Sequence, residues 1–446
     1  MRRRSPFMAE PQAGMRRLAE EVTRIALPFH QSADLDPLMQ RVGDARYVLL
    51  GEASHGTSEY YQWRDRISRR LIREKGFSFI AVEGDWPDCY RVNRYVKGFD
   101  GSGANAQEVL ESFVRWPTWM WSNLETVALA EWLRRHNADA SANRKVGFYG
   151  LDVYSLWESL YAVLGYLRQA NPSLLPAARR ALMCFQPYGE DVQQYARATA
   201  LVPTSCEDEV VDLLATLRAK EPRFHTDRRE EYFTAEQNAL VAKNAEAYYR
   251  AMVRGGPESW NLRDRHMTET LERLMRHHGP DAKGIVWEHN THIGDARYTD
   301  MADEGMFNVG QLVRQQHTSE GVFLVGFGSY RGSVIAAKDW EAPTERMQVP
   351  AAREGSWEDV LHRAAPSNKL LLLRDIRHAD EFLAVRGHRA IGVVYHPEYE
   401  HYGNYVPTVL PRRYDAFCYV DETRALHPLE SHPAFEKIPE TYPWGV

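Results

Sequence analysis

The sequence predicts an α/β protein with a mostly parallel central sheet flanked by helices, and with a large helical insertion. Two observations lead to this prediction. Short apolar segments alternate with helical segments toward both ends of the chain, and the stretch from 154 to 281 contains no clear strand. Alternating strands and helices are typical of parallel sheets covered by helices. We therefore expect one α/β domain over residues 1–446, with residues 154–281 inserted between its third and fourth strands.

Eight short apolar segments are predicted to be buried strands, because each is rich in β-branched or aromatic residues and precedes a turn or polar cluster. In chain order they span residues 45–50, 77–82, 145–151, 284–288, 322–327, 369–373, 390–395 and 416–420. Between them, apolar residues recur near the helical period of 3.6 residues. The predicted helices span residues 58–74, 118–136, 154–170, 230–253 and 260–278, and the last of them ends before Gly279-Pro280, a common stop signal.

The composition is that of an ordinary globular protein, with 446 residues of which 44% are hydrophobic and 26% charged. A formal net charge of −6 gives no sign of the basic surface with which proteins bind nucleic acid. No run approaches the roughly 18 apolar residues of a membrane helix, and the basic N-terminus leads into no apolar segment. Four widely separated cysteines suit a reducing compartment. We therefore expect a cytoplasmic protein without nucleic-acid or membrane partners, whose oligomeric state stays open.

Ionisable residues follow the carboxyl ends of the first four predicted strands. In strand order they are Glu52 with His55, then Glu83, then Asp152, and finally His289 with His292. In open α/β sheets, ligands bind at the edge where parallel strands end. Scattered structural charges would show no preference for one edge, so this pattern predicts a single functional site there.

These residues also have ordinary structural interpretations. Glu52 and His55 could cap the helix that follows them, and Asp152 could cap the next one. Arg64, on the first predicted helix, could form a surface salt bridge, and the two histidines near residue 290 could be plain loop residues. Glu83 argues more strongly for function, because a carboxylate at the end of an apolar strand is costly unless it is paired.

Several common catalytic motifs are missing from the sequence. A Gly-x-Ser-x-Gly elbow is absent, because Ser54 has Glu52 two residues before it, although Ser54 stays a minor candidate for a nucleophile. The phosphate-binding loop and the His-Glu-x-x-His motif are absent as well. His289 and His292 could ligate a metal, but two histidines alone are a weak signal.

At these positions the sequence resembles the erythromycin esterase family, and the resemblance extends from Gly51 to about Trp340. It rests on Gly-Glu-Ala-Ser-His-Gly-Thr-Ser-Glu at 51–59, Val-Glu-Gly-Asp-Trp-Pro at 82–87, Trp-Pro-Thr-Trp-Met-Trp at 116–121, Gly-Leu-Asp at 150–152, Trp-Asn-Leu-Arg-Asp-Arg-His-Met at 260–267 and His-Asn-Thr-His-Ile-Gly-Asp-Ala-Arg at 289–297. The resemblance implies an α/β core with helical insertions and a hydrolase that opens macrolide lactones. The tryptophan-rich segments are more similar to a broad branch of relatives than to the macrolide-resistance enzymes that give antibiotic resistance.

The resemblance also implies which residues are essential. The family's first-loop Glu and His, its second-strand Glu, its helical Arg and its two later histidines match Glu52, His55, Glu83, Arg64, His289 and His292. We assign the first four and His289 to catalysis, and His292, Asp152 and Glu59 to substrate binding. No cofactor is expected, although a divalent metal is possible.

Ester hydrolysis needs an activated water, a donor for the developing oxyanion and an acid for the leaving alcohol. Histidine suits acid–base work because its ordinary pKa, about 6.5, lies near neutrality. We therefore expect His55 to be the general base on water, oriented by Glu83 or Glu52, while His289 or Arg64 polarises the carbonyl of a small-molecule ester or lactone. An exchange of roles between His55 and His289 fits the sequence nearly as well.

Two other functions stay open at this point. The cluster of Glu and His side chains could bind a metal that lowers the pKa of a bound water, which would make the protein a metal-dependent hydrolase. Alternatively, the 12 Trp and 23 Tyr residues could line the pocket of a non-catalytic protein that binds a hydrophobic small molecule.

Overall fold

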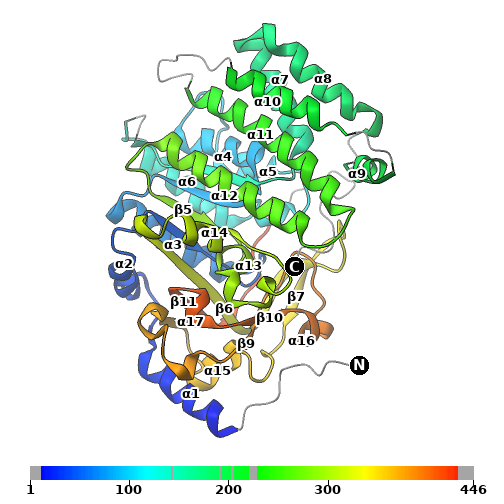
Figure 1. Ribbon diagram of the computed structural model, residues 1–446. Helices are drawn as coiled ribbons and strands as arrows, with labels where there is room; N and C mark the ends of the chain where they lie inside the picture. The colour runs from blue at the N-terminus through cyan, green and yellow to red at the C-terminus, as the bar shows by residue number, and fades with distance from the viewer. Residues whose placement is uncertain (1–11, 142–143, 190–191, 202–204, 220–228, 430–446) are drawn as a thin grey trace.

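The computed structural model describes residues 12–141, 144–189, 192–201, 205–219 and 229–429. Its central sheet has the strand order β1-β8-β11-β6-β2-β5-β3-β4, and β7 pairs with β6 outside this path. The strands are β1 (Leu27–Pro28), β2 (Tyr47–Leu50), β3 (Phe79–Asp85), β4 (Gly147–Asp152), β5 (Gly284–Trp287), β6 (Val322–Ala337), β7 (Thr344–Val349), β8 (Lys369–Leu371), β9 (Arg386–Arg389), β10 (Tyr405–Thr408) and β11 (Ala416–Thr423). From β11 to β4 every neighbouring pair is parallel. The predicted fold, α/β with a mostly parallel sheet, is therefore confirmed (Figure 1).

The described α-helices surround this sheet (Figure 1). They are α1 (Gln12–Ile25), α2 (Asp36–Val42), α3 (Ser58–Lys75), α4 (Trp86–Lys97), α5 (Ala106–Glu111), α6 (Leu124–Asn137), α7 (Leu156–Ala170), α8 (Leu175–Phe185), α9 (Val192–Leu201), α10 (Glu207–Ala219), α11 (Arg229–Met252), α12 (Glu258–His278), α13 (Asn290–Ile293), α14 (Val309–Gln316), α15 (Trp357–Ala364), α16 (Glu400–Gly403) and α17 (Leu410–Arg413). None of the described helices is long and apolar enough to cross a membrane.

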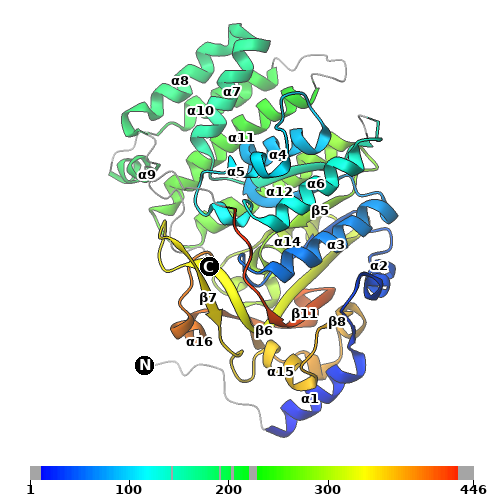
Figure 2. The same cartoon turned by 180° about the vertical axis from the view of Figure 1, so that it is seen from behind.

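The central strands divide their side chains between two hydrophobic cores, because successive residues of a strand face opposite sides of the sheet. In β2, Val48 and Leu50 belong to the core that also contains the apolar face of α3. Tyr47 and Leu49 belong to the other core, which includes apolar residues of α12 and α14. Figure 1 shows α12 and α14 over one face of the sheet, and Figure 2 shows α3 over the other.

Between β4 and β5 the described residues form helices α7 to α12 and no strand. Helices α7 to α11 share a separate hydrophobic core, and most of them stand away from the sheet in Figure 1. The last helix, α12, instead packs on the sheet. The helical character of the described part of 154–281 therefore agrees with the sequence, while the single-domain organisation stays a prediction.

Three local expectations differ from the structure. Residues 390–395 do not form a strand: Ile391 and Val394 make isolated bridges to Ser54 and Ala337, while the preceding β9 pairs with β10 in a small separate sheet. The helix expected from 118 begins only at Leu124, because the Asn123 side chain accepts the Thr126 N–H and caps it there.

The cysteines also differ from expectation. The structure joins Cys184 and Cys206 by a disulfide in the helical segment. Disulfides are rare in reducing compartments, so the cysteine count no longer supports such a compartment. Cys89 and Cys418 are free and buried.

Candidate active site

A cavity of about 110 Å³ lies where β2, β3, β4 and β5 end. Its polar side is formed by His55, Glu83, Asp85, Asp88, Arg115, Asp152, Arg263, His289 and His292. Its other side is largely apolar and includes Phe113, Trp116, Met120, Trp121, Trp340 and Val393. Tyr154 and Arg263 come from the helical segment, which therefore forms part of the cavity wall. The cavity thus combines charged and polar groups with apolar and aromatic side chains, as small-molecule sites commonly do.

His55 is held by a chain of charged groups behind the cavity. Its Nδ1 lies 2.9 Å from Glu52 Oε1, and the other oxygen of Glu52 accepts from Arg64 Nη2 at 2.5 Å. Because an ionised carboxylate can only accept, His55 Nδ1 carries the proton and its Nε2 is left with a lone pair. Burial lowers the pKa of His55, but the charge of Glu83 and the hydrogen bond that His55 donates to Glu52 raise it more, so the net shift is upward.

Arg64 positions Glu52 and does not line the cavity. The guanidinium lies between two aromatic rings, 4.4 Å from the Tyr61 centroid and 4.7 Å from that of Trp287, and the side chain is fully buried. Of the two residues that the sequence offered for polarising a carbonyl, only His289 lines the cavity. Glu52 is likewise outside the cavity and acts through His55.

Glu83 is the charged partner shared by both histidine-bearing loops. One oxygen accepts the backbone N–H of His289 at 2.8 Å, and the other accepts from Arg263 Nη2 at 2.7 Å. Burial raises the pKa of Glu83, but neighbouring positive charges and the hydrogen bond from the His289 N–H outweigh burial. The net result is a pKa well below the ordinary value. Glu83 is therefore ionised near neutral pH, and its charge favours the protonated form of His55.

Arg263 is central to the site, although it was not among the predicted site residues; it lies within the sequence motif at 260–267. Its guanidinium donates to both oxygens of Asp152, at 2.9 and 2.7 Å, in addition to Glu83. A third nitrogen lies 3.0 Å from His292 Nε2. Arg263 shares the buried face of α12 with Met267 and Leu271. A charged residue at the 3.6-residue spacing of an apolar stripe is the signal that could have revealed it.

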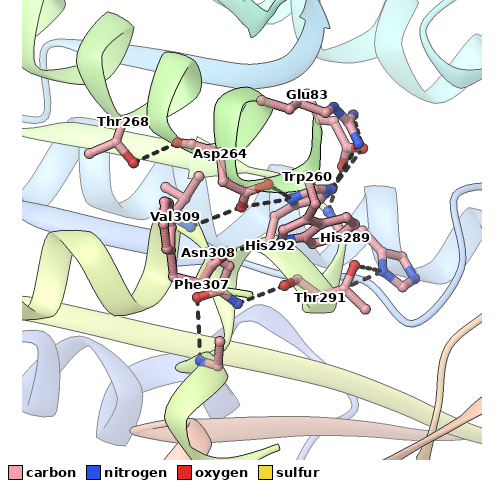
Figure 3. A network of polar contacts seen from close by, with 12 residues as sticks. Glu83, Trp260, Asp264, Thr268, His289, Thr291, His292, Phe307, Asn308 and Val309 are labelled. Carbon is pink, nitrogen blue, oxygen red and sulfur yellow. Dashed lines mark hydrogen bonds and ion pairs between the residues drawn. The ribbon is translucent and has the colours of Figure 1, made fainter. Parts of the chain in front are cut away.

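Both ring nitrogens of His292 lie within hydrogen-bond distance of neighbouring side chains. Its Nδ1 lies 3.0 Å from both oxygens of Asp264, and Trp260 stacks on the ring at 4.5 Å (Figure 3). Since Asp264 accepts at Nδ1 and Arg263 donates at Nε2, both ring nitrogens are occupied. His292 and Asp152 line the cavity, as expected for substrate-binding residues, but both are already bound to Arg263.

Two further candidates lie outside the cavity. Glu59 accepts hydrogen bonds from the backbone N–H of Arg424 at 2.7 Å and from Arg424 Nε at 2.9 Å, and it does not line the cavity, so its assignment to substrate binding stays a prediction. Glu59 lies in the first turn of α3, next to the residues that follow β11, and for that reason it points away from the cavity. The hydroxyl of Ser54 is hydrogen bonded to Thr57 and also lies outside the cavity.

His289 has the opposite tautomer to His55. The Thr291 backbone N–H donates to His289 Nδ1, and the Thr291 hydroxyl lies 2.8 Å from the same nitrogen (Figure 3). Nδ1 therefore accepts, and the proton resides on Nε2, which has no hydrogen-bond partner among the described residues. Burial and the charge of His55 lower the pKa of His289 well below its ordinary value, so the ring is neutral. The centroids of the two rings lie 5.0 Å apart, and the ring planes are tilted by 46°.

The same side chains do not fit a metal site. Among the described residues, no group of three or more His, Cys, Asp or Glu side chains is placed to hold a metal ion. The carboxylates considered as ligands are paired with guanidinium groups, Glu52 with Arg64 and Glu83 with Arg263. A metal would have to displace these buried ion pairs, and we assign no step to one.

Glu288 is a fully buried carboxyl group beside the site, and it has no assigned role. Neither of its oxygens has a hydrogen-bond partner among the described residues. Burial, followed by the charges of Glu83 and Asp264, raises the pKa of Glu288 well above its ordinary value. Burial among these charges thus stabilises Glu288 as the protonated acid.

Replacing Glu288 by glutamine should therefore stabilise the protein increasingly as the pH rises. The folded protein keeps a proton on Glu288 that the unfolded chain loses above its pKa of about 4.5, so native stability falls with rising pH. The free energies of unfolding of Glu288→Gln and of the native protein should differ little at pH 5. The difference should then grow by about 1.4 kcal/mol per pH unit until the pH reaches the pKa of Glu288 in the folded protein, which thermal unfolding at several pH values measures. Glu354→Gln, on a side chain that is 82% exposed, is the control. Equal pH dependence of Glu288→Gln and native protein would contradict a protonated Glu288.

The fold and the site define an α/β protein with a buried histidine–carboxylate centre suited to acid–base chemistry. The erythromycin esterase family model matches residues 72–423, and the chain belongs to that family. It is 22% identical over 366 residues to an erythromycin esterase type II of Escherichia coli, covering 77% of this chain and 84% of that protein.

Three solved structures share the fold. A succinoglycan biosynthesis protein has a TM-score of 0.76 at 22% identity and covers 94% of this chain and 100% of its own. A protein from Bacillus cereus has a TM-score of 0.75 at 19% identity, covering 93% and 99%. A histidine mutant of the erythromycin esterase EreC in its open conformation has a TM-score of 0.62 at 16% identity, covering 89% and 95%.

Proposed function

We propose that this protein hydrolyses a carboxylic ester or lactone of a small molecule with a water molecule that His55 activates. The observation that carries the proposal is the opposite tautomers of the two neighbouring rings. His55 presents a lone pair on Nε2 because its Nδ1–H donates to Glu52. His289 presents an N–H on Nε2 because its Nδ1 accepts from Thr291. One ring is thereby prepared to take a proton and the other to donate a hydrogen bond.

These roles give a complete first step. His55 Nε2 takes a proton from water while the water oxygen attacks the carbonyl carbon. The carbonyl oxygen gains negative charge and accepts a hydrogen bond from His289 Nε2–H, in the manner of an oxyanion hole. The charge of Glu83 stabilises the imidazolium of His55. Cleavage of the carbon–oxygen bond then releases an alcohol, or opens the ring of a lactone.

Membership of the family supports a hydrolase that acts on a small molecule. Macrolide lactones are candidate substrates, because the Escherichia coli relative is named an erythromycin esterase. The apolar side of the cavity, where the rings of Trp116 and Trp340 lie 5.0 Å apart, favours an ester with an apolar or aromatic substituent.

The test is a hydrolysis screen over macrolides, aryl esters and simple lactones, with protein dialysed against EDTA and with untreated protein. Turnover that survives EDTA is expected, since the proposed steps use only side chains. Turnover that is lost with EDTA and restored by a divalent metal would favour a metal-dependent hydrolase. Saturable ligand binding without turnover would favour a non-catalytic binding protein.

Substitutions of His289 distinguish a hydrogen-bond donor from a base. His289→Ala should lower kcat by about 10²–10³-fold with little change in KM, the usual loss for one oxyanion-hole donor. His289→Asn should lose less, because its amide keeps an N–H near the same place. In both variants kcat/KM should still rise with pH, because His55 is intact.

The pH profile is the critical measurement for His289. If the rising limb of kcat/KM vanished in His289→Ala but survived in His55→Ala, the two roles would be exchanged. Equal losses in His289→Ala and His289→Asn would also count against a donor role, because only a base would lose as much with the amide.

A further inference from the structure

Asp85 lines the cavity and does not cap the helix that begins after it. It ends β3 and stands at the N-cap of the twelve-residue helix α4, yet its side chain accepts no hydrogen bond from that helix. Aspartate is favoured at N-caps because it accepts such a bond. The Asp85 side chain instead lines the same cavity as His55 and His289.

The carboxyl groups around Asp85 outnumber the cations that pair with them, which favours a proton on one of these carboxyl groups. Arg115 Nε lies 2.6 Å from Asp85 Oδ2, and Arg115 Nη2 lies 2.6 Å from Glu158 Oε2. One guanidinium thus serves two carboxyl groups. Two further acids, Asp88 and Asp152, stand close enough to raise the pKa of Asp85. Asp152 is paired with Arg263 and Asp88 with Arg91, so neither of those cations is available to Asp85 alone.

Of the two carboxyl groups that contact Arg115, Asp85 is the one that takes this proton. The Glu158 side chain is 28% exposed and keeps contact with water, whereas that of Asp85 is 11% exposed. The Asp85 Oδ1 atom is buried and has no hydrogen-bond partner among the described residues. A buried charged oxygen without a partner costs more free energy than a neutral one. The proton is therefore less costly on Asp85 than on Glu158.

We propose that Asp85 is the general acid that protonates the leaving alcohol, a role that rests on the proposed ester hydrolysis. When the tetrahedral intermediate collapses, the carbon–oxygen bond breaks and its electron pair goes to the leaving oxygen. The carboxyl proton of Asp85 moves to that oxygen, which gives the alcohol and the Asp85 carboxylate. The proton that His55 took from water then returns to solvent, Asp85 is reprotonated from solvent, and the net reaction consumes one water.

The protonation of Asp85 agrees with this role. Burial, opposed by Arg115 but reinforced by Asp88, Asp152 and Glu158, raises the pKa of Asp85 to about 7. An acid with such a pKa is partly protonated at neutral pH, near the optimum for proton transfer to a reacting group. The competing possibility is that His55 both removes and returns the proton, in which case Asp85 is dispensable for the leaving group.

Esters that differ only in the leaving group distinguish these two possibilities in the native protein. Two esters with the same acyl group are compared, one that releases 4-nitrophenol and one that releases a simple alkyl alcohol. Nitrophenolate leaves without an acid, so its kcat/KM should rise with pH to a plateau. The alkyl ester needs the acid, so its profile should rise with deprotonation of His55 and fall again as Asp85 ionises. A falling limb for both esters, or for neither, would overturn the proposal.

Asp85→Asn gives the second comparison. It should lower kcat/KM for the alkyl ester by about 10²–10⁴-fold and change that for the nitrophenyl ester little, because only the first reaction uses the acid. Equal losses on both esters would show a structural role and overturn the proposal. Absence of turnover of both esters by the native protein would instead refute the hydrolase itself.

Glu158→Gln is the matched control, because it removes the other partner of Arg115 and leaves Asp85 in place. Without the charge of Glu158, which raises the pKa of Asp85, the falling limb for the alkyl ester should move to lower pH while the preference between leaving groups persists. This test applies even if Asp85→Asn does not fold. An infrared band of a protonated carboxyl group, titrating near neutral pH and insensitive to substrate, should also be present in native protein. An unmoved falling limb, or absence of that band, would overturn the proposal.

Discussion

Replacement of His55 by alanine is expected to lower kcat by about 10²–10⁴-fold, the usual contribution of a positioned acid–base group. His55→Asn should be nearly as damaging, because an amide at that position cannot accept the proton of water. Both variants should lose the rising limb of kcat/KM. That limb should lie above the ordinary pKa of histidine, since the charge of Glu83 and the hydrogen bond to Glu52 raise the pKa of His55 despite its burial. The measurement is a pH series of initial rates on the ester found by the screen.

The same variants distinguish catalysis from helix capping. A cap lost at His55 would appear mainly as reduced stability, and asparagine would replace it well. A catalytic role predicts the reverse, with melting temperatures close to native and turnover lost in both variants. Retained turnover in His55→Asn would remove His55 as the base and move that assignment to His289.

The other large effect is expected from Arg263→Lys, because one guanidinium holds three partners together. It binds both oxygens of Asp152, one oxygen of Glu83 and the ring of His292. Lysine keeps the charge but has no planar fork that reaches several partners at once. We expect a loss of about 3–5 kcal/mol in the free energy of unfolding, the usual cost of breaking a buried ion pair.

Activity of Arg263→Lys should fall as well, because Glu83 would no longer be held beside the His289 loop. Assays well below the melting temperature of the variant separate this effect from unfolding. Arg265→Lys is the matched control, on the same helix but on an exposed side chain. Arg263→Met adds a second readout: the charge of Arg263 lowers the pKa of His55, so its removal should shift the rising limb to higher pH. If Arg263→Lys kept the stability and activity of the native protein, the positions of Glu83 and Asp152 would not depend on the guanidinium of Arg263.

The central strands and the convergence of their terminal residues could be predicted from the sequence, because both follow from local patterns. Apolar segments of strand length recur along the chain, and β2, β3, β4 and β5 lie within a few residues of their expected positions. Parallel strands end at the same edge whatever their order in the sheet, so His55, Glu83 and His289 had to meet there. Local patterns do not suffice for the segment 390–395, because its residues have a strand-like composition but form only isolated bridges.

The tertiary structure alone decided what each site residue does, because a side chain's role depends on partners from distant parts of the chain. Arg64 and Glu59 stand on the same helix, but only the position of that helix against the sheet places one behind Glu52 and the other beside Arg424. Arg263 meets residues 111 and 180 positions away. The tautomers of the two histidines are likewise set by their through-space neighbours. Hydrogen bonds act over about 3 Å, and no local periodicity encodes which distant group will lie within that distance.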